Sequence, residues 1–403
     1  MNWEQKTLGE LVEALIDHRG RTPKKLGTDF VANGVPVLSA QLVTNGFIDW
    51  SNTRFVDQQT FELWMPQKLK KSDVLLTSEA PLGRTAILNR EQNVVLGQRL
   101  FALRGKRGVL DNHYLHYWLR SDKGQAVLTS HAQGTTVIGI RQSSLRSISV
   151  DLPSITTQKA IADVLGALDD KIAANQRVIS DAAELCEALV QKSISGEFTK
   201  LSEIAVITMG TSPKGEHLNE EGRGIPFFQG VRDFGDISPK RRVYTDKPLR
   251  TAEPGDVLLA VRAPIGQVNL ALEKVCIGRG LAAVRSAINS PVSLFYLLRS
   301  HREIWQDFDG NGTVFSSVNR SDAHNVLVPI ILPTKQKDLE KVLNTIHGRL
   351  LKAQKENQVL AATRDELLPL LMNRKITVVE AEEAVGDVGV VKQKQQEEGD
   401  SDV

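Results

Sequence analysis

The 403-residue sequence predicts a mixed α+β protein in which one unit occurs twice. Two observations predict this fold class. A series of short motifs occurs twice in the same order, at a spacing near 180 residues, and an apolar heptad pattern follows each series. We therefore expect two duplicated α/β domains, separated by two long helices that form an antiparallel coiled coil.

The duplicated motifs run through nearly the whole chain. A Gly-x-Pro segment at 34–38 recurs at 224–228, and the Asp-Val-Leu-Leu segment at 73–76 recurs at 256–259. The same order is kept by 80–83 with 263–266, 96–99 with 277–280, 119–121 with 298–300, 134–135 with 312–313, 152–153 with 332–333, and 158–159 with 336–337.

Within each copy, Gly and Pro divide about the first 150 residues into short β-branched runs, which are typical of strands. Examples are 73–77 and 257–261. One amphipathic helix is expected in each copy, at 112–119 and at 291–299. The mixed domains are predicted to span 1–152 and 200–332.

The segments 153–199 and 333–376 are predicted to be the long helices, each roughly 40 residues and about 60 Å long. Residues 151–199 carry 4 basic and 8 acidic side chains, whereas 334–379 carry 9 and 5, so opposite charges favour pairing of the two helices. Heptads alone leave the direction open, and pairing with other chains is the alternative. An approximate twofold relation between the copies favours the antiparallel arrangement. The expected seam consists of Ile161, Leu165, Leu168, Ile172, Asn175, Ile179, Ala182, Cys186 and Leu189, facing Leu339, Leu343, Ile346, Leu350, Ala353, Asn357, Leu360, Arg364 and Leu367.

Composition excludes several classes of protein. No apolar run approaches the ~18 residues that cross a bilayer, and the first residues lack the features of a signal peptide, so we expect a cytoplasmic protein without a membrane partner. Cys186 and Cys276 are 90 positions apart, which excludes a disulfide framework and a structural zinc site. Residues 377–403 are predicted to be a disordered acidic tail, because 380–403 carry 8 acidic and 2 basic residues without apolar periodicity.

The sequence contains no motif that predicts catalysis. The Gly-rich segment 210–215 is followed by Glu216 where a phosphate-binding loop requires Lys, and 278–280 is too short for a dinucleotide fingerprint. His113 and His116 fit successive positions on a helix better than metal ligands. We therefore expect a chain without catalytic residues, bound metal or cofactor of its own.

Charge and loop composition favour a nucleic-acid partner. Residues 1–150 carry 19 basic and 13 acidic side chains, and 200–333 carry 16 and 14, with Arg and Gln in the repeated loops. Arg pairs with guanine and Gln with adenine through two hydrogen bonds each. Solvated charge runs, simple turns and surface salt bridges are the alternative for each side chain. The candidate DNA-contacting residues are Arg21, Lys24, Lys25, Gln41, Arg84, Arg99, Thr135, Thr136, Arg141, Gln229, Arg232, Lys240, Arg241, Arg262, Arg279, Thr313, Ser316, Asn319 and Arg320.

The ordered motifs, with the segments 7–11 and 201–205 that open the two copies, resemble the specificity subunit of type I restriction-modification enzymes over residues 1–376. The resemblance implies two target recognition domains, each reading one half of a bipartite, asymmetric site in double-stranded DNA, with the coiled coil as spacer. It implies two modification subunits that methylate with S-adenosylmethionine. It also implies restriction subunits that translocate and cleave with ATP and Mg²⁺, and the cofactors are expected on these partners.

Two other classes of function stay open. A scaffold or adaptor protein could use the coiled coil for partners and the repeated domains for protein or glycan. A self-sufficient nuclease or methyltransferase would show activity as the purified chain. A DNA-binding protein that contacts phosphates loses affinity for DNA steeply as the salt concentration rises, whereas a scaffold does not.

If the protein binds DNA, two recognition domains on one stiff spacer favour half-sites about 34 to 36 Å apart.

Overall fold

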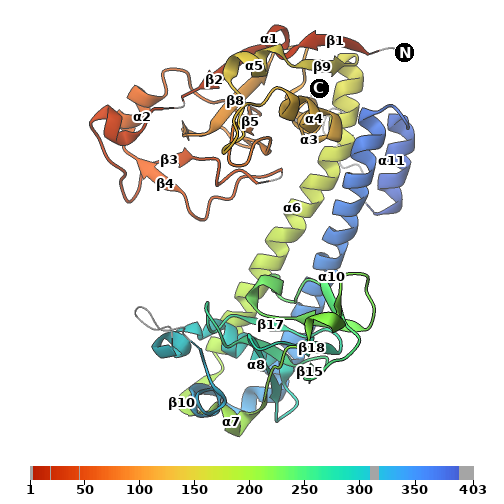
Figure 1. Ribbon diagram of the computed structural model, residues 1–403. Coiled ribbons are helices and arrows are strands. Elements are labelled where there is room, and N and C mark those ends of the chain that lie inside the picture. The colour runs from red at the N-terminus through yellow and green to blue at the C-terminus, as the bar shows by residue number, and fades with distance from the viewer. Residues whose placement is uncertain (1–2, 19, 45, 309–316, 390–403) are drawn as a thin grey trace, which may run out of the picture. The chain divides into compact units, whose positions relative to one another are not determined.

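The computed structural model describes residues 3–18, 20–44, 46–308 and 317–389, which divide into two compact units (Figure 1). Unit 1 comprises Met1–Ala174 and Glu356–Val403, and unit 2 comprises Asn175–Lys355. The long helices α6 (Ile155–Gln191) and α10 (Pro333–Met372) each contribute one part to each unit. The mixed α+β class predicted from the sequence is therefore confirmed.

Unit 1 is built on a four-stranded sheet of order β2-β8-β5-β6, a three-stranded sheet of order β4-β3-β7, and a β1-β9 pair. Its strands are β1 (Glu4–Thr7), β2 (Val12–Asp17), β3 (Val35–Leu38), β4 (Arg54–Val56), β5 (Val74–Thr77), β6 (Thr85–Ile87), β7 (Val95–Leu96), β8 (Leu100–Gly105) and β9 (Ser149–Leu152). Its other helices are α1 (Leu8–Leu11), η1 (Pro23–Leu26), α2 (Gln58–Trp64), α3 (Asn112–Arg120), α4 (Asp122–Ser130), α5 (Gln142–Ser147) and α11 (Val378–Asp387).

Unit 2 repeats this plan with sheets of order β11-β19-β16-β17 and β12-β14-β13-β18-β15, and a β10-β20 pair. Its strands are β10 (Ile194–Lys200), β11 (Ala205–Met209), β12 (Leu218–Asn219), β13 (Ile225–Phe228), β14 (Val243–Thr245), β15 (Thr251–Ala252), β16 (Val257–Ala260), β17 (Val268–Leu270), β18 (Val275–Ile277), β19 (Leu281–Ser286) and β20 (Leu327–Ile331). Its helices are α7 (Leu201–Ile204), η2 (Gly215–His217), η3 (Val231–Asp233), α8 (Pro291–Ser300), η4 (Arg302–Phe308) and α9 (Arg320–Asn325).

The duplicated Asp-Val-Leu-Leu motif has the same role in both units. Asp73 is buried, accepts a hydrogen bond from the backbone N–H of Lys70 at 2.8 Å, and binds Arg104 through both carboxylate oxygens at 2.7 Å. Asp256 does the same with the N–H of Glu253 at 2.8 Å and with Arg285 at 2.7 and 2.8 Å. A buried carboxylate is stable only when its oxygens are paired, so the motif fixes the turn that opens the central strand.

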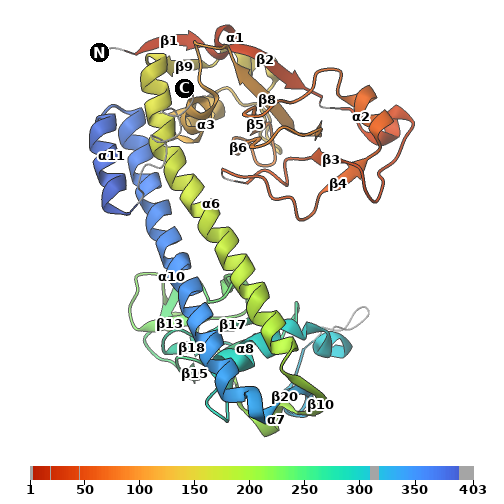
Figure 2. The same ribbon diagram turned by 180° about the vertical axis from the view of Figure 1, so that it is seen from behind.

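The α6 and α10 helices lie side by side and run antiparallel (Figure 2). In unit 1, the Asn357 side chain donates to the carbonyl of Ile172 at 3.3 Å and Arg364 binds Asp169 at 2.6 Å, so residue numbers rise along one helix as they fall along the other. In unit 2, Lys335 donates to the carbonyl of Lys192 at 3.0 Å. Most of the predicted seam is buried, which agrees with heptad packing within one chain.

A tyrosine and an arginine of each mixed domain contact the long helices. In unit 1, Tyr117 and Arg120 on α3 donate to Asp169 on α6 at 2.8 and 3.1 Å. In unit 2, the equivalent α8 residues are Tyr296, whose hydroxyl lies 3.0 Å from the His347 ring, and Arg299, which binds Glu187 at 2.7 Å. The duplicated Leu-Arg-Ser motif is therefore a docking contact between domain and helix.

Two predicted boundaries need correction. Residues 194–199, expected at the end of a long helix, belong to β10, which pairs with β20. The predicted disorder of 377–403 is wrong for 378–387, which form α11. Thr377 and Glu380 make a capping box at its start, and Ala381 and Val385 are buried in the core of unit 1. Residues 390–403 lie outside the described part of the chain.

Both cysteines are buried free thiols. Among the helices of the described residues, none combines the length and the apolar character that a bilayer crossing requires.

Candidate nucleic-acid interface

In unit 1, backbone hydrogen bonds extend the β3–β7 pair of one sheet and the β5–β8 pair of the other, and residues 97–99 connect the two sheets. The N–H of Gly97 donates to the carbonyl of Leu38 at 2.8 Å, and the N–H of Ser78 donates to the carbonyl of Arg99 at 2.9 Å. The N–H of Ile140 in turn donates to the carbonyl of Ser78 at 2.9 Å. Segments far apart in the sequence are thus held together at one place.

Unit 2 forms the same set of bonds at equivalent residues. The N–H of Gly278 donates to Phe228 at 2.8 Å, Val261 donates to Gly280 at 2.9 Å, and Val318 donates to Val261 at 2.9 Å. We call each set the strand-end frame. It comprises 38–39, 78–79, 97–99 and 139–140 in unit 1, and 228–229, 261–262, 278–280 and 317–318 in unit 2.

Glycine is required where the frame strands approach most closely. A Cβ atom on Gly97 would lie 2.3 Å from the carbonyl oxygen of Leu38, and one on Gly280 would lie 2.4 Å from that of Gln229. Such distances are far inside van der Waals contact, so any side chain would push the strands apart. At Gly278, the equivalent of Gly97, a Cβ atom would lie 2.4 Å from Oε1 of Gln229, so this glycine leaves room for the Gln229 side chain.

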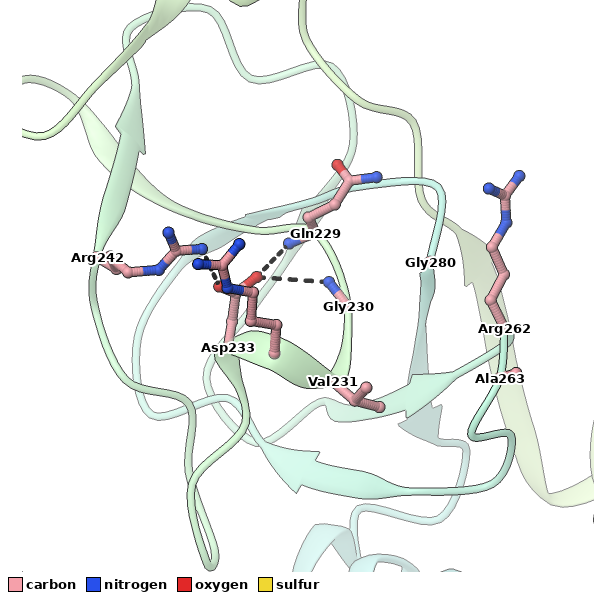
Figure 3. A pocket seen from close by; sticks show the side chains of 9 residues that line it. Gln229, Gly230, Val231, Asp233, Arg242, Arg262, Ala263 and Gly280 are labelled. Carbon is pink, nitrogen blue, oxygen red and sulfur yellow. Dashed lines mark hydrogen bonds and ion pairs between the residues drawn. The ribbon is translucent and has the colours of Figure 1, made fainter. Parts of the chain in front are cut away.

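The frame of unit 2 borders an open pocket of about 340 Å³ that is rich in arginine (Figure 3). Asp233, buried at its base, accepts hydrogen bonds from the backbone N–H groups of Gln229 at 2.7 Å and Gly230 at 3.4 Å, and it binds Arg242 at 3.0 Å. The side chains of Gln229 and Arg262 extend away from this carboxylate in Figure 3. Asp233 therefore fixes the backbone that carries Gln229.

The side chains at the mouth of this frame are exposed hydrogen-bonding groups. The Ser212 hydroxyl donates to Oε1 of Gln229 at 2.8 Å and accepts from the backbone N–H of Arg279 at 3.2 Å, which orients the Gln229 amide. Arg262 and Arg279 are exposed, and within the described residues no carboxylate forms an ion pair with either. These donors match what base edges and phosphates accept.

Unit 1 has the same frame with different side chains. Ser39 stands where unit 2 has Gln229, Glu79 where it has Arg262, Gln98 where it has Arg279, and Arg99 where it has Gly280. Nε of Arg99 lies 3.1 Å from Oε1 of Glu79, and both side chains are partly exposed. The two frames therefore share a set of backbone hydrogen bonds but offer different side-chain donors and acceptors.

The structure brings some of the predicted residues together. Gln229, Arg232 and Arg262 line the pocket of unit 2, and Arg99 lies in the frame of unit 1. Lys24, Lys25, Gln41, Arg84, Thr135, Thr136, Arg141, Lys240, Arg279 and Arg320 are exposed.

Other predicted residues already have partners within the protein. Arg21 donates to the carbonyl of Trp64 at 2.6 Å, Arg241 binds Glu273 at 2.5 Å, and Asn319 caps α9 by accepting from the N–H of Asp322 at 3.0 Å. Arg99 is paired with Glu79. Thr313 and Ser316 lie outside the described residues.

Sequence reasoning missed Glu79, Gln98, Asp233 and Arg242. The signal for the first two was present, because alignment of the duplicated motifs sets Glu79 against Arg262 and Gln98 against Arg279. Asp233 has no carboxylate counterpart in unit 1, where Leu42 makes the equivalent backbone hydrogen bonds. No three His, Cys, Asp or Glu side chains gather as potential metal ligands within the described residues.

Comparison with known proteins agrees with this duplicated architecture. Residues 1–184 match the model of the type I restriction modification DNA specificity domain. Over 94% of its length, the chain is 28% identical to the type I restriction enzyme MjaX specificity subunit of Methanocaldococcus jannaschii, of which 94% is covered. The chain is therefore similar to type I specificity subunits over nearly its whole length.

Two further proteins are similar, one in sequence and one in fold. The EcoBI specificity subunit of Escherichia coli is 22% identical over 175 residues, which cover 42% of this chain and 37% of that one. The crystal structure of the S subunit from M. genitalium has the same fold, with a TM-score of 0.59 at 18% identity, over 92% of this chain and 96% of that chain.

Proposed function

We propose that this specificity subunit reads a bipartite, asymmetric DNA sequence, and that each unit recognises one half. The strand-end frame carries the proposal: one backbone arrangement occurs twice, with Glu79, Gln98 and Arg99 in unit 1 against Arg262, Arg279 and Gly280 in unit 2. Different hydrogen-bonding groups on equal scaffolds select different bases. Two such readers in one chain select a site whose halves differ.

The remaining basic side chains support this function by contacting phosphates. Lys24 and Lys25 lie on η1, and Lys240 and Arg320 are exposed in unit 2. Phosphate contacts position a protein on DNA and make its affinity depend on salt, whereas contacts to base edges provide the specificity. Mutation of these residues would weaken binding to all sequences equally.

In the proposed complex the subunit itself performs no covalent chemistry. Two modification subunits, using S-adenosylmethionine, would methylate the bound DNA, and restriction subunits would use ATP and Mg²⁺ to translocate and cleave it in the cytoplasm. The purified chain alone would then show neither methylation nor cleavage, and methylation would appear when modification subunits are added.

Exchange of one mixed domain tests whether each unit recognises its half-site independently of the other. Residues 1–152 are replaced by the corresponding region of another specificity subunit, and methylated bases are mapped across the host genome. We expect one half-site of the methylated sequence to change and the other to persist, because each frame lies within one unit. A change in both halves would show that the units do not read independently.

A salt titration separates the DNA reader from a scaffold that binds protein or glycan. The complex with modification subunits should lose affinity for its DNA steeply between about 50 and 200 mM salt, since each phosphate contact releases counterions. Affinity that is weak and nearly independent of salt would favour the scaffold.

A further inference from the structure

Glu79 and Arg262 occupy one and the same backbone position in the two units. Glu79 forms an isolated antiparallel bridge with Gly139, and Arg262 forms the equivalent bridge with Ser317. Each residue also precedes an Ala-Pro turn with a cis peptide bond, at Ala80-Pro81 and Ala263-Pro264. The two positions therefore share their bridge and the Ala-Pro turn that follows, although φ is +50° at Ala80 and is not positive at Ala263.

The side chains at this position have opposite charge, and their neighbours differ accordingly. The Glu79 side chain is 38% exposed and its carboxylate pairs with Arg99, whose side chain is 53% exposed. In unit 2 the residue equivalent to Arg99 is Gly280, so Arg262 has no charged neighbour at that position. Unit 1 therefore presents an acceptor held by a cation, and unit 2 presents a donor.

A carboxylate on a DNA-facing surface is repelled by phosphates and requires a compensating interaction. The amino group of cytosine in the major groove supplies one, because it donates a hydrogen bond that Glu or Asp accepts. The guanidinium of arginine instead forms two hydrogen bonds with O6 and N7 of guanine. The charge reversal would therefore suit this position to cytosine in unit 1 and to guanine in unit 2.

We infer that Glu79 and Arg262 are specificity-determining residues. Glu79, positioned by Arg99, accepts a hydrogen bond from a cytosine amino group in the half-site of unit 1. Arg262 donates to a guanine in the half-site of unit 2. This inference rests on the proposed function and adds to it the base class that each unit selects at one position.

The test uses the full chain in complex with its modification subunits. Binding is measured for a panel of duplexes in which every base pair of the recognition sequence is varied in turn. Glu79→Gln should reduce discrimination at a single C·G pair of one half-site by about 5- to 150-fold, and leave the other half-site unchanged. The double variant Glu79→Arg with Arg99→Gly, which transplants the unit 2 pair, should prefer guanine at that position.

A matched control comes from unit 1 itself. Glu62 pairs with Lys68 at 3.0 Å, and their side chains are 51% and 50% exposed, but the pair lies on α2 and its following loop, outside the frame. Glu62→Gln removes one negative charge, as Glu79→Gln does, but leaves the strand-end frame unchanged. The preference of this variant at every base pair should equal that of the wild type.

The outcomes distinguish the two levels of the proposal. Unchanged preference in Glu79→Gln, or an equal change in affinity for all duplexes, would overturn the inference while the wild type still selects its sequence. A wild-type complex without any sequence preference would overturn the proposed function instead. If Glu79→Gln lowers the melting temperature, the Arg262→Gln variant provides the test instead. Arg262→Gln should lose the preference for guanine at one base pair of the other half-site. An unchanged preference for guanine in this variant would count against the inference.

Discussion

At the scale of single residues, buried histidines link the stability of both units to pH. Burial and the charge of Arg120 lower the pKa of His116 to about 3, against a smaller opposing effect of Asp169. Burial and the charge of Arg299 lower the pKa of His347 to about 4. Both imidazoles are almost inaccessible to solvent, so the folded protein keeps them neutral.

These pKa shifts predict a loss of stability in mild acid. The unfolded chain binds protons near pH 6.5 and the folded chain does not, so the contribution of each histidine is complete above pH 6.5 and falls as the pH decreases toward the folded value. At pH 5 each should cost about 2 kcal/mol of unfolding free energy. Melting temperatures between pH 7.5 and 5 measure the effect.

The matched control is His113, which is exposed on the same helix. His113→Gln should leave the pH dependence unchanged, whereas His116→Gln should reduce its slope. Equal slopes in the wild type and in both variants would exclude a role for His116.

At the scale of elements, one interruption of the apolar heptad pattern forms an ion pair between the two long helices. Arg364 occupies an apolar position of the seam and binds Asp169, which Arg120 and Tyr117 also contact. Burial alone would raise the pKa of Asp169, but the two guanidinium groups outweigh it and lower that pKa. The seam thus includes a charged cluster that joins α3, α6 and α10 in unit 1.

Arg364→Leu would restore an apolar heptad, yet we expect it to destabilise unit 1. Asp169 would keep only Arg120 as a charged partner, and breaking a buried ion pair costs up to about 3 kcal/mol here, the low end of the usual range. Hydrogen exchange of α6 residues in unit 1 should accelerate, with β16 of unit 2 unaffected. Glu356→Gln, which breaks the more exposed Lys171–Glu356 pair, should change the exchange little. Equal effects of both variants would contradict this assignment.

Element positions were largely predictable, whereas side-chain partners were not. The helices expected at 112–119 and 291–299 are α3 and α8, because strong local patterns mark them. Helix α11 was not predicted because its sequence is acidic, although Thr377 and Glu380 have the spacing of a capping box. The Glu79–Arg99 pair joins residues that the antiparallel pairing of β5 with β8 brings together, and nothing local in the sequence encodes that contact.

At the scale of the whole molecule, the long helices are expected to set the distance between the two half-sites. Insertion of one heptad into both α6 and α10, after Ile172 and before Asn357, preserves the seam and lengthens each helix by about 10.5 Å. The spacer between half-sites should then grow by about three base pairs at 3.4 Å each, with both half-site sequences unchanged. Mapping of methylated bases provides the measurement.

The control for this experiment replaces an existing heptad by the inserted sequence at constant helix length. It should methylate the original site with the original spacer. An unchanged spacer in the lengthened protein would mean that the helices do not determine the distance.

The docking contacts of the mixed domains also bear on how such a gene can change over generations. Tyr117 and Arg120 in unit 1, like Tyr296 and Arg299 in unit 2, form the same kind of contact with the helices, while the frame side chains differ. A crossover that imports a foreign domain with this tyrosine and arginine keeps its fit to the resident helices. Inheritance of a new target sequence therefore requires no simultaneous mutation elsewhere in the chain.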